Sequence, residues 1–197
     1  MKKIKILSLL FCVVMLVAAC HDDEEGPIIP QPREQVGRTV LVYIVGDNGV
    51  NELSDLFKTN FEDMKEGMKE VDYSKCNLVV YSEMVNDVPR LVSLKKQNGK
   101  VVADTLFTYS EQNPLAKEVM SSVISQTVSY FPADSYGFVF LSHSSSWVPA
   151  TNDANSRSIG YYRRTQMNIP DFHDVLLSSF PRPLKFILFD SCSMQAV

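Results

Sequence analysis

The sequence predicts an α/β fold built on a mainly parallel β-sheet with helices on both faces. Four short runs rich in apolar, β-branched and aromatic residues fit buried strands, at residues 39–45, 77–81, 136–141 and 186–189. Stretches in which apolar residues recur at helical spacing separate most of these runs. Strands that alternate with helices favour parallel pairing. The composition, 45% hydrophobic and 21% charged, is ordinary for one globular domain. The net charge of −4 comes without a basic patch, so nothing indicates a nucleic-acid partner.

The first predicted helix follows the strand 39–45 and a turn of glycine, aspartate and asparagine at 46–49. Asn51 or Ser54 can cap this helix, which then runs to about Glu70. Its expected core face consists of apolar residues spaced three or four apart, which are Leu53, Leu56, Phe57, Phe61, Met64 and Met68.

The other elements are also predicted from local signals. Residues 97–99, Gln-Asn-Gly, lie between the strand-like runs 90–94 and 100–107, which predicts a hairpin. A proline opens a helix over 114–130. A further helix, started by an asparagine or a proline, occupies about 168–180 and precedes the last strand.

The amino-terminal segment has the pattern of an export leader. Three lysines among the first five residues precede the apolar stretch 6–17, which is too short to span a membrane. Small residues before Cys20 resemble a bacterial lipobox. This resemblance implies a signal peptide over 1–19 and a lipid on the Cys20 sulfur, and an ordinary secretory signal is the alternative.

Residues 20–37 are expected to form a flexible acidic and proline-rich tether to a folded domain over 38–197. The acidic run 21–25 resembles the signal that sends some lipoproteins to the cell surface; alternatively it is a solvated spacer. Three prolines keep the rest of the tether extended. The expected location is therefore the cell envelope of a Gram-negative bacterium, with the anchor in the outer membrane or at the cell surface.

Cysteine usage leaves a free thiol at the end of a strand. Of the four cysteines, Cys12 is removed with the leader and Cys20 carries the lipid, so no disulfide framework is expected. Cys76 precedes a strand and is expected to be a small buried residue. Cys192 follows the strand 186–189 and remains as a candidate for chemistry.

Two of the predicted strands end in residues suited to nucleophilic chemistry. One runs into His143 and the other into Asp190-Ser191-Cys192. In open α/β sheets, active sites lie beyond the carboxyl ends of the strands. A thiol needs a neighbouring base to become a thiolate near neutral pH, and a histidine at the next strand end supplies one. The alternative is structural: Cys192 as a buried thiol and His143 as a core histidine bonded to a serine.

These strand ends resemble the two catalytic motifs of the clostripain family of cysteine peptidases. The matching segments are 140–147 (FLSHSSSW) and 187–194 (ILFDSCSM), and 42–48 (VYIVGDN) is similar to the family's first strand and turn. The 49 residues from His143 to Cys192 are close to the separation of about 50 in caspases, which share the fold. The resemblance implies a caspase-like three-layer α/β/α sandwich that is incomplete at its carboxyl-terminal end.

The resemblance also implies a role for each strand-end residue. Cys192 is the nucleophile, His143 the general acid/base, and the main-chain N–H groups of Ser144 and Cys192 form the oxyanion hole. Asp190 holds a basic P1 side chain; alternatively it accepts backbone N–H bonds at a strand end. Asp47 either supports the site or forms an Asx turn. Ser144 stands where the family has glycine, which reaches backbone angles that strain a serine.

The segment 150–164 is polar and without period, so it is expected to be an exposed loop. Resembling enzymes often cut themselves between the histidine and cysteine strands, which makes Arg157, Arg163 and Arg164 candidate processing sites; solvated arginines are the alternative. Family members continue far beyond the cysteine, whereas five residues follow Cys192 here. A missing carboxyl-terminal part or a second chain is therefore an expected partner.

The predicted function is that of an exported, lipid-anchored cysteine endopeptidase that cleaves proteins or peptides after Arg or Lys through a Cys–His dyad. The alternative is a catalytically inactive relative or fragment that binds protein or peptide at the same place. No cofactor is expected from the residues themselves, and calcium is implied only by the family resemblance.

Overall fold

The structure, a computed structural model of the chain, describes residues 30–49, 51–144, 158–191 and 194. All elements named below belong to one compact unit, Gln31–Val197. The predicted lipid site Cys20 and the motif residue Cys192 lie outside the described residues.

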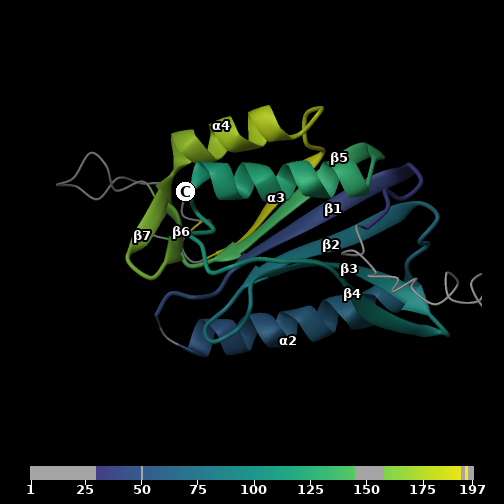
Figure 1. The fold of residues 1–197 in the computed structure, drawn as a ribbon, viewed down its shortest axis with the longest axis horizontal. Coiled ribbons are helices and arrows are strands. Elements are labelled where there is room, and N and C mark those ends of the chain that lie inside the picture. The colour runs from purple at the N-terminus through teal and green to yellow at the C-terminus, as the bar shows by residue number, and fades with distance from the viewer. Residues whose placement is uncertain (1–29, 50, 145–157, 192–193, 195–197) are drawn as a thin grey trace, which may run out of the picture. The chain divides into compact units, whose positions relative to one another are not determined.

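A six-stranded sheet forms the centre of this unit, in the order β4-β3-β2-β1-β5-β8 (Figure 1). The strands β1 (Val36–Val45), β2 (Cys76–Glu83), β5 (Ala133–Ser142) and β8 (Phe186–Ser191) run parallel to one another. The antiparallel hairpin of β3 (Arg90–Gln97) and β4 (Lys100–Thr108) extends one edge. A second, two-stranded sheet pairs β6 (Ser158–Tyr162) with β7 (Thr165–Asn168). The predicted mainly parallel sheet is confirmed.

Helices cover both faces of the large sheet (Figure 1). Helix α2 (Asn51–Gly67), followed by the short 3-10 helix η1 (Met68–Glu70), lies on one face, and α3 (Lys117–Tyr130) and α4 (Ile169–Ser179) lie on the other. Strand β1 shows why both faces are apolar, because alternate side chains of a strand point to opposite faces. Leu41, Tyr43 and Val45 enter the core under α3 and α4, whereas Val42 and Ile44 enter the core under α2. This arrangement is the predicted three-layer sandwich.

Aromatic rings fill the core between the sheet and the helices α3 and α4. Tyr43 of β1 stacks on Tyr81 of β2 with ring centroids 4.5 Å apart. Phe138 and Phe140 of β5 lie with their ring centroids 5.9 and 5.4 Å from that of Phe172 of α4. Such pairs add to the stabilisation from burial, because aromatic edges and faces carry opposite partial charge. They fix β5, the strand that leads to the predicted histidine, firmly against α4.

Two local predictions are confirmed in detail. Asn98 and Gly99 form the turn between β3 and β4 with φ angles of 51° and 77°. Positive φ at both positions is what a two-residue type I′ turn requires. At the start of α4, the side-chain oxygen of Asn168 accepts a hydrogen bond from the N–H of Asp171 at 2.7 Å. This is an N-cap contact, so of the two predicted starting residues Asn168 is the one that caps the helix.

Several predicted boundaries are wrong by a few residues. β1 begins at Val36, so the expected end of the tether at residue 37 falls inside a strand. The helix expected from Pro114 begins at Lys117 because a turn precedes it, in which the N–H of Leu115 donates to the side chain of Asn113 at 3.0 Å. Asn113 thus ends the connection from β4, and Pro114 lies in the turn.

The predicted burial also fails at particular side chains. Leu56, which the helical spacing predicts on the core face of α2, is 54% exposed, because the helix packs on the sheet through Phe57 and its neighbours one turn away. Ser54 does not cap α2: it lies inside the helix and its hydroxyl donates to the carbonyl of Gly46 at 3.0 Å. Cys76, the first residue of β2, is only half-buried.

The prediction of an irregular loop over 150–164 is wrong for its second part. Residues 158–162 form β6, where Ile159 is fully buried and Tyr162 nearly so. Gly160, with a φ of 79°, lies at an irregularity of the β6–β7 pairing. Because the irregularity breaks the two-residue alternation, the strand does not show in the sequence pattern.

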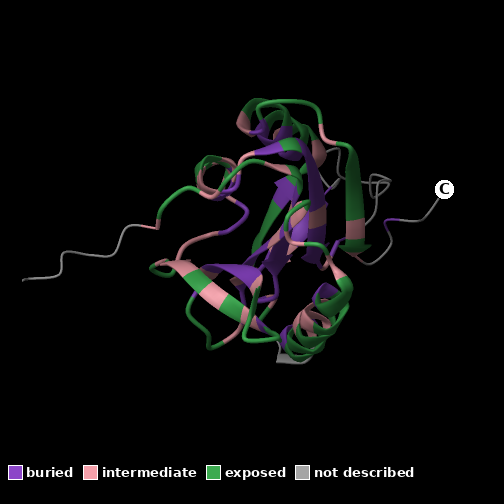
Figure 2. Cartoon of the chain, turned by 90° about the vertical axis from the view of Figure 1, so that its right-hand side faces the viewer, coloured by how far each residue is buried: buried purple, intermediate pink, exposed green. Residues whose placement is uncertain are grey.

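The edge strand β8 leaves much of its apolar side-chain surface exposed. Phe186, Ile187 and Leu188 are 38%, 43% and 52% exposed. Figure 2 shows the contrast with the central strands, which are mostly buried. Three adjacent exposed apolar residues on an edge strand are unusual, because such an edge invites pairing with other protein.

Candidate active site

The ends of β5 and β8, each followed in the chain by a predicted site residue, lie at the same edge of the sheet. The two strands are parallel neighbours, with Ser142 in register with Ser191. His143 follows Ser142 in the chain, and Cys192 follows Ser191. Cys192 lies outside the described residues, so its position beside His143 remains a prediction.

His143 is half-buried and packs against the β6–β7 hairpin. Its ring centroid lies 4.9 Å from that of Tyr161, with the ring planes inclined by 58°. The hydroxyl of Ser142 accepts a hydrogen bond from the main-chain N–H of Tyr161 at 3.1 Å. The hairpin therefore contacts both the histidine ring and the residue that precedes it.

Ser144, which replaces the family's glycine, is 2% exposed. Among the described residues other than glycine, a positive φ occurs at Asn86, Asn98 and Arg163, and Ser144 is not one of them. The backbone here therefore does not need the left-handed conformation that would strain a serine.

Asp190, the predicted holder of a basic P1 side chain, is exposed. Its carboxylate accepts a hydrogen bond from the side-chain amide of Asn60 on α2 at 3.2 Å. Asp190 is in register with Leu141, whose side chain belongs to the core under α2. The carboxylate is thus on the α2 side of the sheet edge and open to a cation.

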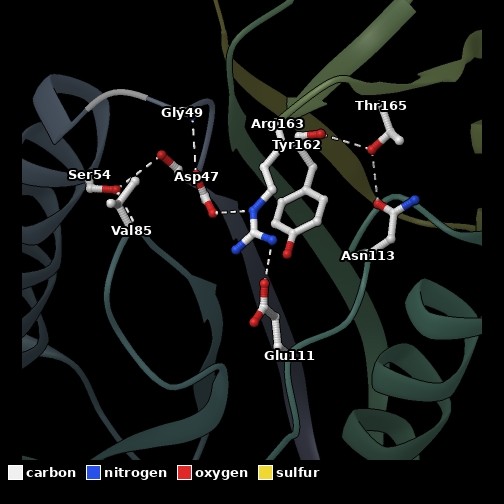
Figure 3. A network of polar contacts seen from close by, with 10 residues as sticks. Asp47, Gly49, Ser54, Val85, Glu111, Asn113, Tyr162, Arg163 and Thr165 are labelled. Carbon is white, nitrogen blue, oxygen red and sulfur yellow. Dashed lines mark hydrogen bonds and ion pairs between the residues drawn. The ribbon is translucent and has the colours of Figure 1, made fainter.

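A network of polar contacts joins the turn after β1 to the hairpin β6–β7 (Figure 3). Nε of Arg163 donates to Oδ2 of Asp47 at 2.8 Å, and Nη1 pairs with Oε1 of Glu111. The main-chain N–H of Arg163 donates to the carbonyl of Asp47 at 2.8 Å. Asp47 also accepts from the N–H of Gly49 at 3.1 Å, which is the predicted Asx turn. The same carboxylate therefore forms a turn and anchors a distant hairpin.

Glu83, at the end of β2, is a buried carboxyl group beside this network. It is 3% exposed, and its Oε2 has no hydrogen-bond partner within the described ranges. Burial, reinforced by the negative charge of Asp47, raises the pKa of Glu83 from 4.5 to about 8, and the charge of Arg163 opposes this shift. Neither Glu83 nor Glu111 was singled out from the sequence, since each lies in an ordinary polar context.

The described parts of the chain offer no group of three or more histidine, cysteine or acidic side chains that could hold a metal ion. The acidic residues Asp47 and Glu111 are instead paired with Arg163. We therefore assign calcium to no residue. None of the helices in the described ranges is long and apolar enough to cross a membrane.

The three candidate processing arginines differ in their surroundings. Arg157 lies outside the described residues. Arg163 forms the turn of the hairpin and is held by the two carboxylates of the network. Arg164 is exposed and makes no hydrogen bond or ion pair with any residue that the structure describes.

Comparison with known proteins supports the resemblance seen in the motifs. A model of the clostripain family matches residues 42–197, which include both strand ends. A search of curated proteins found no match.

Three solved structures are similar to the chain. A secreted C11 cysteine protease from Bacteroides thetaiotaomicron, in complex with an irreversible peptide inhibitor, is 40% identical with a TM-score of 0.69, over 81% of this chain and 43% of that chain. An inactive zymogen C11 protease from Parabacteroides distasonis is 33% identical with a TM-score of 0.65, over 81% and 43%. A B. fragilis cysteine protease is 41% identical with a TM-score of 0.53, over 60% and 98%.

The chain therefore spans less than half the length of two of these proteases. Their fold and the matched motifs agree with the caspase-like sandwich that the sequence predicts. The chain belongs to the clostripain family of cysteine peptidases.

Proposed function

We propose that this protein is an exported, lipid-anchored cysteine endopeptidase that cleaves after Arg or Lys through a dyad of Cys192 and His143. The observation that carries the proposal is the register of β5 and β8, in which the residues that precede His143 and Cys192 are paired. Two parallel strand ends at one edge are where a thiol and an imidazole can act together.

The chemistry follows from these two groups. The Cys192 thiol gives its proton to the His143 imidazole, and the thiolate sulfur attacks the scissile carbonyl carbon. Main-chain N–H groups of Ser144 and Cys192 donate hydrogen bonds to the oxygen as it becomes an anion. His143 then protonates the leaving amine as the C–N bond breaks, which leaves a thioester. A water molecule, deprotonated by His143, hydrolyses the thioester and restores the thiol.

The specificity for basic residues is assigned to Asp190. Its carboxylate is exposed, lies one residue before the end of β8 and contacts Asn60 rather than a cation. A guanidinium can pair with such a carboxylate through two parallel N–H donors, and an ammonium can pair with it as a point charge. A P1 arginine or lysine beside Cys192 would place its charge within reach of Asp190.

Further protein is expected to cover the outer side of β8. Phe186, Ile187 and Leu188 are partly exposed there, and an apolar groove of about 700 Å³ lies between α4 and β8. Two related proteases are more than twice as long as the part that this chain matches. The proposed occupant is the carboxyl-terminal part that the family resemblance implies, and the peptidase activity is expected of a form that includes it.

Export and lipid anchoring rest on the leader sequence. One related protease from Bacteroides is described as secreted, which supports a location outside the cytoplasm or in the envelope. Replacing Cys20 by serine should release the protein to the soluble fraction or leave its precursor uncut. If the Cys20→Ser variant fractionates with membranes like the wild type, the lipid anchor is refuted.

The test of the chemistry is affinity labelling of the reduced protein. A peptidyl electrophile with arginine at P1 should alkylate Cys192, and the same compound with aspartate at P1 should react far more slowly. His143→Ala should slow the reaction strongly. Mass spectrometry that places the whole adduct on Cys76, the half-buried thiol of β2, would contradict the proposal. It would favour a non-catalytic relative that binds peptides at the same edge.

A further inference from the structure

We infer that Arg163 is a positioning residue for His143, and that it acts through Tyr161 of the β6–β7 hairpin. The functional consequence of this inference rests on the proposed role of His143 as general acid/base. Its structural part, that the Arg163 anchor sets the surroundings of the His143 ring, does not depend on that role.

Arg163 is fixed by four contacts at the hairpin turn (Figure 3). Its main-chain N–H donates to the Asp47 carbonyl and its Nε to Oδ2 of Asp47, both at 2.8 Å. Its Nη1 pairs with Glu111, and its guanidinium carbon lies 5.0 Å from the ring centroid of Tyr162. The hydrogen bonds that the Arg163 side chain donates to Asp47 and Glu111 raise the pKa of Arg163, so the side chain stays charged.

The backbone of Arg163 adopts a conformation that needs such support. Its φ is 53°, in the left-handed region that residues with a Cβ avoid. A residue keeps this unfavourable backbone conformation only where contacts with its surroundings stabilise it. The bonds to Asp47 supply these contacts, and without them we expect the turn to relax.

The turn at Arg163 is connected to the His143 ring through Tyr161. Tyr161 lies two residues before Arg163 in the hairpin and contacts the His143 ring at 4.9 Å between centroids. The main-chain N–H of Tyr161 also binds the hydroxyl of Ser142 at 3.1 Å. Movement of the turn would therefore change the packing of the ring and the hydrogen bond of the residue before it.

Strand β6 has little freedom to move and so cannot restore the position of Tyr161 if the turn relaxes. A Cβ at Gly160 would lie only 2.8 Å from Leu115 and 2.9 Å from Phe140, so this strand runs against the core without a gap. The core holds β6 and Asp47 holds the turn, so the position of Tyr161 between them is fixed. The Asp47–Arg163 contact thus sets where Tyr161 meets His143.

Arginine is required here because two carboxylates are bound by different nitrogens of one planar group. A lysine at this position offers one compact ammonium group and can hold either Asp47 or Glu111 well. Arg163→Lys should therefore retain part of the anchoring, whereas Arg163→Met, which keeps the length of the side chain, should lose it. Arg164→Met is the matched control for the ring signals, since Arg164 contacts no partner in the described part of the chain. It is left out of the alkylation measurement because Arg164 is a candidate processing site.

The experiment compares these variants with the wild type by two measurements. All proteins are kept reduced and have the full-length form that includes the proposed carboxyl-terminal part. The first is NMR of the histidine rings, with the exposed His173 of α4 as an internal reference. In Arg163→Met the His143 ring signals should move towards those of His173, in Arg163→Lys they should move less, and in Arg164→Met they should not move. The second is the pH profile of Cys192 alkylation, where Arg163→Met should lower the rate at neutral pH by about 10- to 100-fold.

Tyr161→Leu keeps the inference testable if Arg163→Met fails to fold. This variant leaves the ion pairs of Arg163 in place and removes the ring that contacts His143, so it should shift the His143 signals as Arg163→Met does. Unchanged His143 signals in either folded variant, or an equal shift in Arg164→Met, would overturn the inference. If His143→Ala leaves the alkylation profile unchanged, the proposed catalytic role fails, while the ring signals still decide whether Arg163 positions His143.

Discussion

Replacing Glu83 by glutamine should change how the stability of this protein depends on pH. The carboxyl group of Glu83 is 3% exposed, and this burial is the main cause that opposes its ionisation. The charges of Asp47 and Glu111 add to the effect of burial, and the charge of Arg163 opposes it. The balance raises its pKa from 4.5 to about 8. The folded protein therefore keeps a proton on Glu83 over a pH range in which the unfolded chain has released it.

The sign and size of the effect follow from proton linkage. The stabilisation is fully present below pH 4.5 and is lost as the pH rises through about 8. Within this window the contribution of Glu83 to the free energy of unfolding should fall by up to about 1.4 kcal/mol per pH unit. Glutamine stays neutral at every pH and can still accept a hydrogen bond from the N–H of Asp47, so Glu83→Gln should lack this dependence.

The assay is urea unfolding followed by circular dichroism between pH 5 and 9. The difference in unfolding free energy between Glu83→Gln and the wild type should grow in favour of the variant up to about pH 8 and then level off. Glu34→Gln, at an exposed carboxyl group that contacts no described residue, is the control and should change little. If the curves of wild type and Glu83→Gln stay parallel from pH 5 to 9, Glu83 does not hold the proton.

Two further predictions concern the β6–β7 hairpin and the segment that precedes it. Gly160→Ala should lower the stability by about 1–3 kcal/mol through overcrowding, besides the strain of its φ of 79°. Gly99→Ala, with a φ of 77° and no atom within 4 Å of the new Cβ, measures the effect of backbone strain without crowding. If Gly160→Ala and Gly99→Ala lower the melting temperature equally, crowding at Gly160 is refuted. Self-processing of a full-length form should give new amino termini after Arg157 or Arg164, and not after Arg163, which Asp47 and Glu111 hold. Sequencing of new termini beside a Cys192→Ala variant checks this, and a terminus after Arg163 would contradict it.

The fold could be predicted because its signals are local. The parallel strands are apolar runs with turn residues at their ends, and Asn98-Gly99 determines the β3–β4 turn within two residues. The hairpin β6–β7 escaped prediction because its strands are only five and four residues long and Gly160 interrupts their alternation. Strands this short, with one irregularity, do not show a measurable period.

The candidate site could be predicted only in part, for a related reason. His143 and Asp190 stand at the ends of β5 and β8, so the strand pattern itself places them at one edge, whereas Cys192 lies outside the described residues and its place there stays a prediction. The contact of Arg163 with Asp47 joins residues 116 positions apart, and nothing near either residue in the sequence indicates the other. Contacts of this kind depend on how the elements pack, so the polar network behind the site appears only in the structure.

The course of the chain explains why the hairpin bears on His143. Because β5 and β8 are parallel, the chain must return from the end of one to the start of the other through a crossover. Among the described elements of this crossover β6 and β7 come first, in contact with His143 through Tyr161, and α4 then covers the sheet on the way back. The Asp47–Arg163 contact ties the early part of the crossover to the end of β1. One connection therefore begins at His143, is anchored to the central strand, and ends in the strand that leads to Cys192.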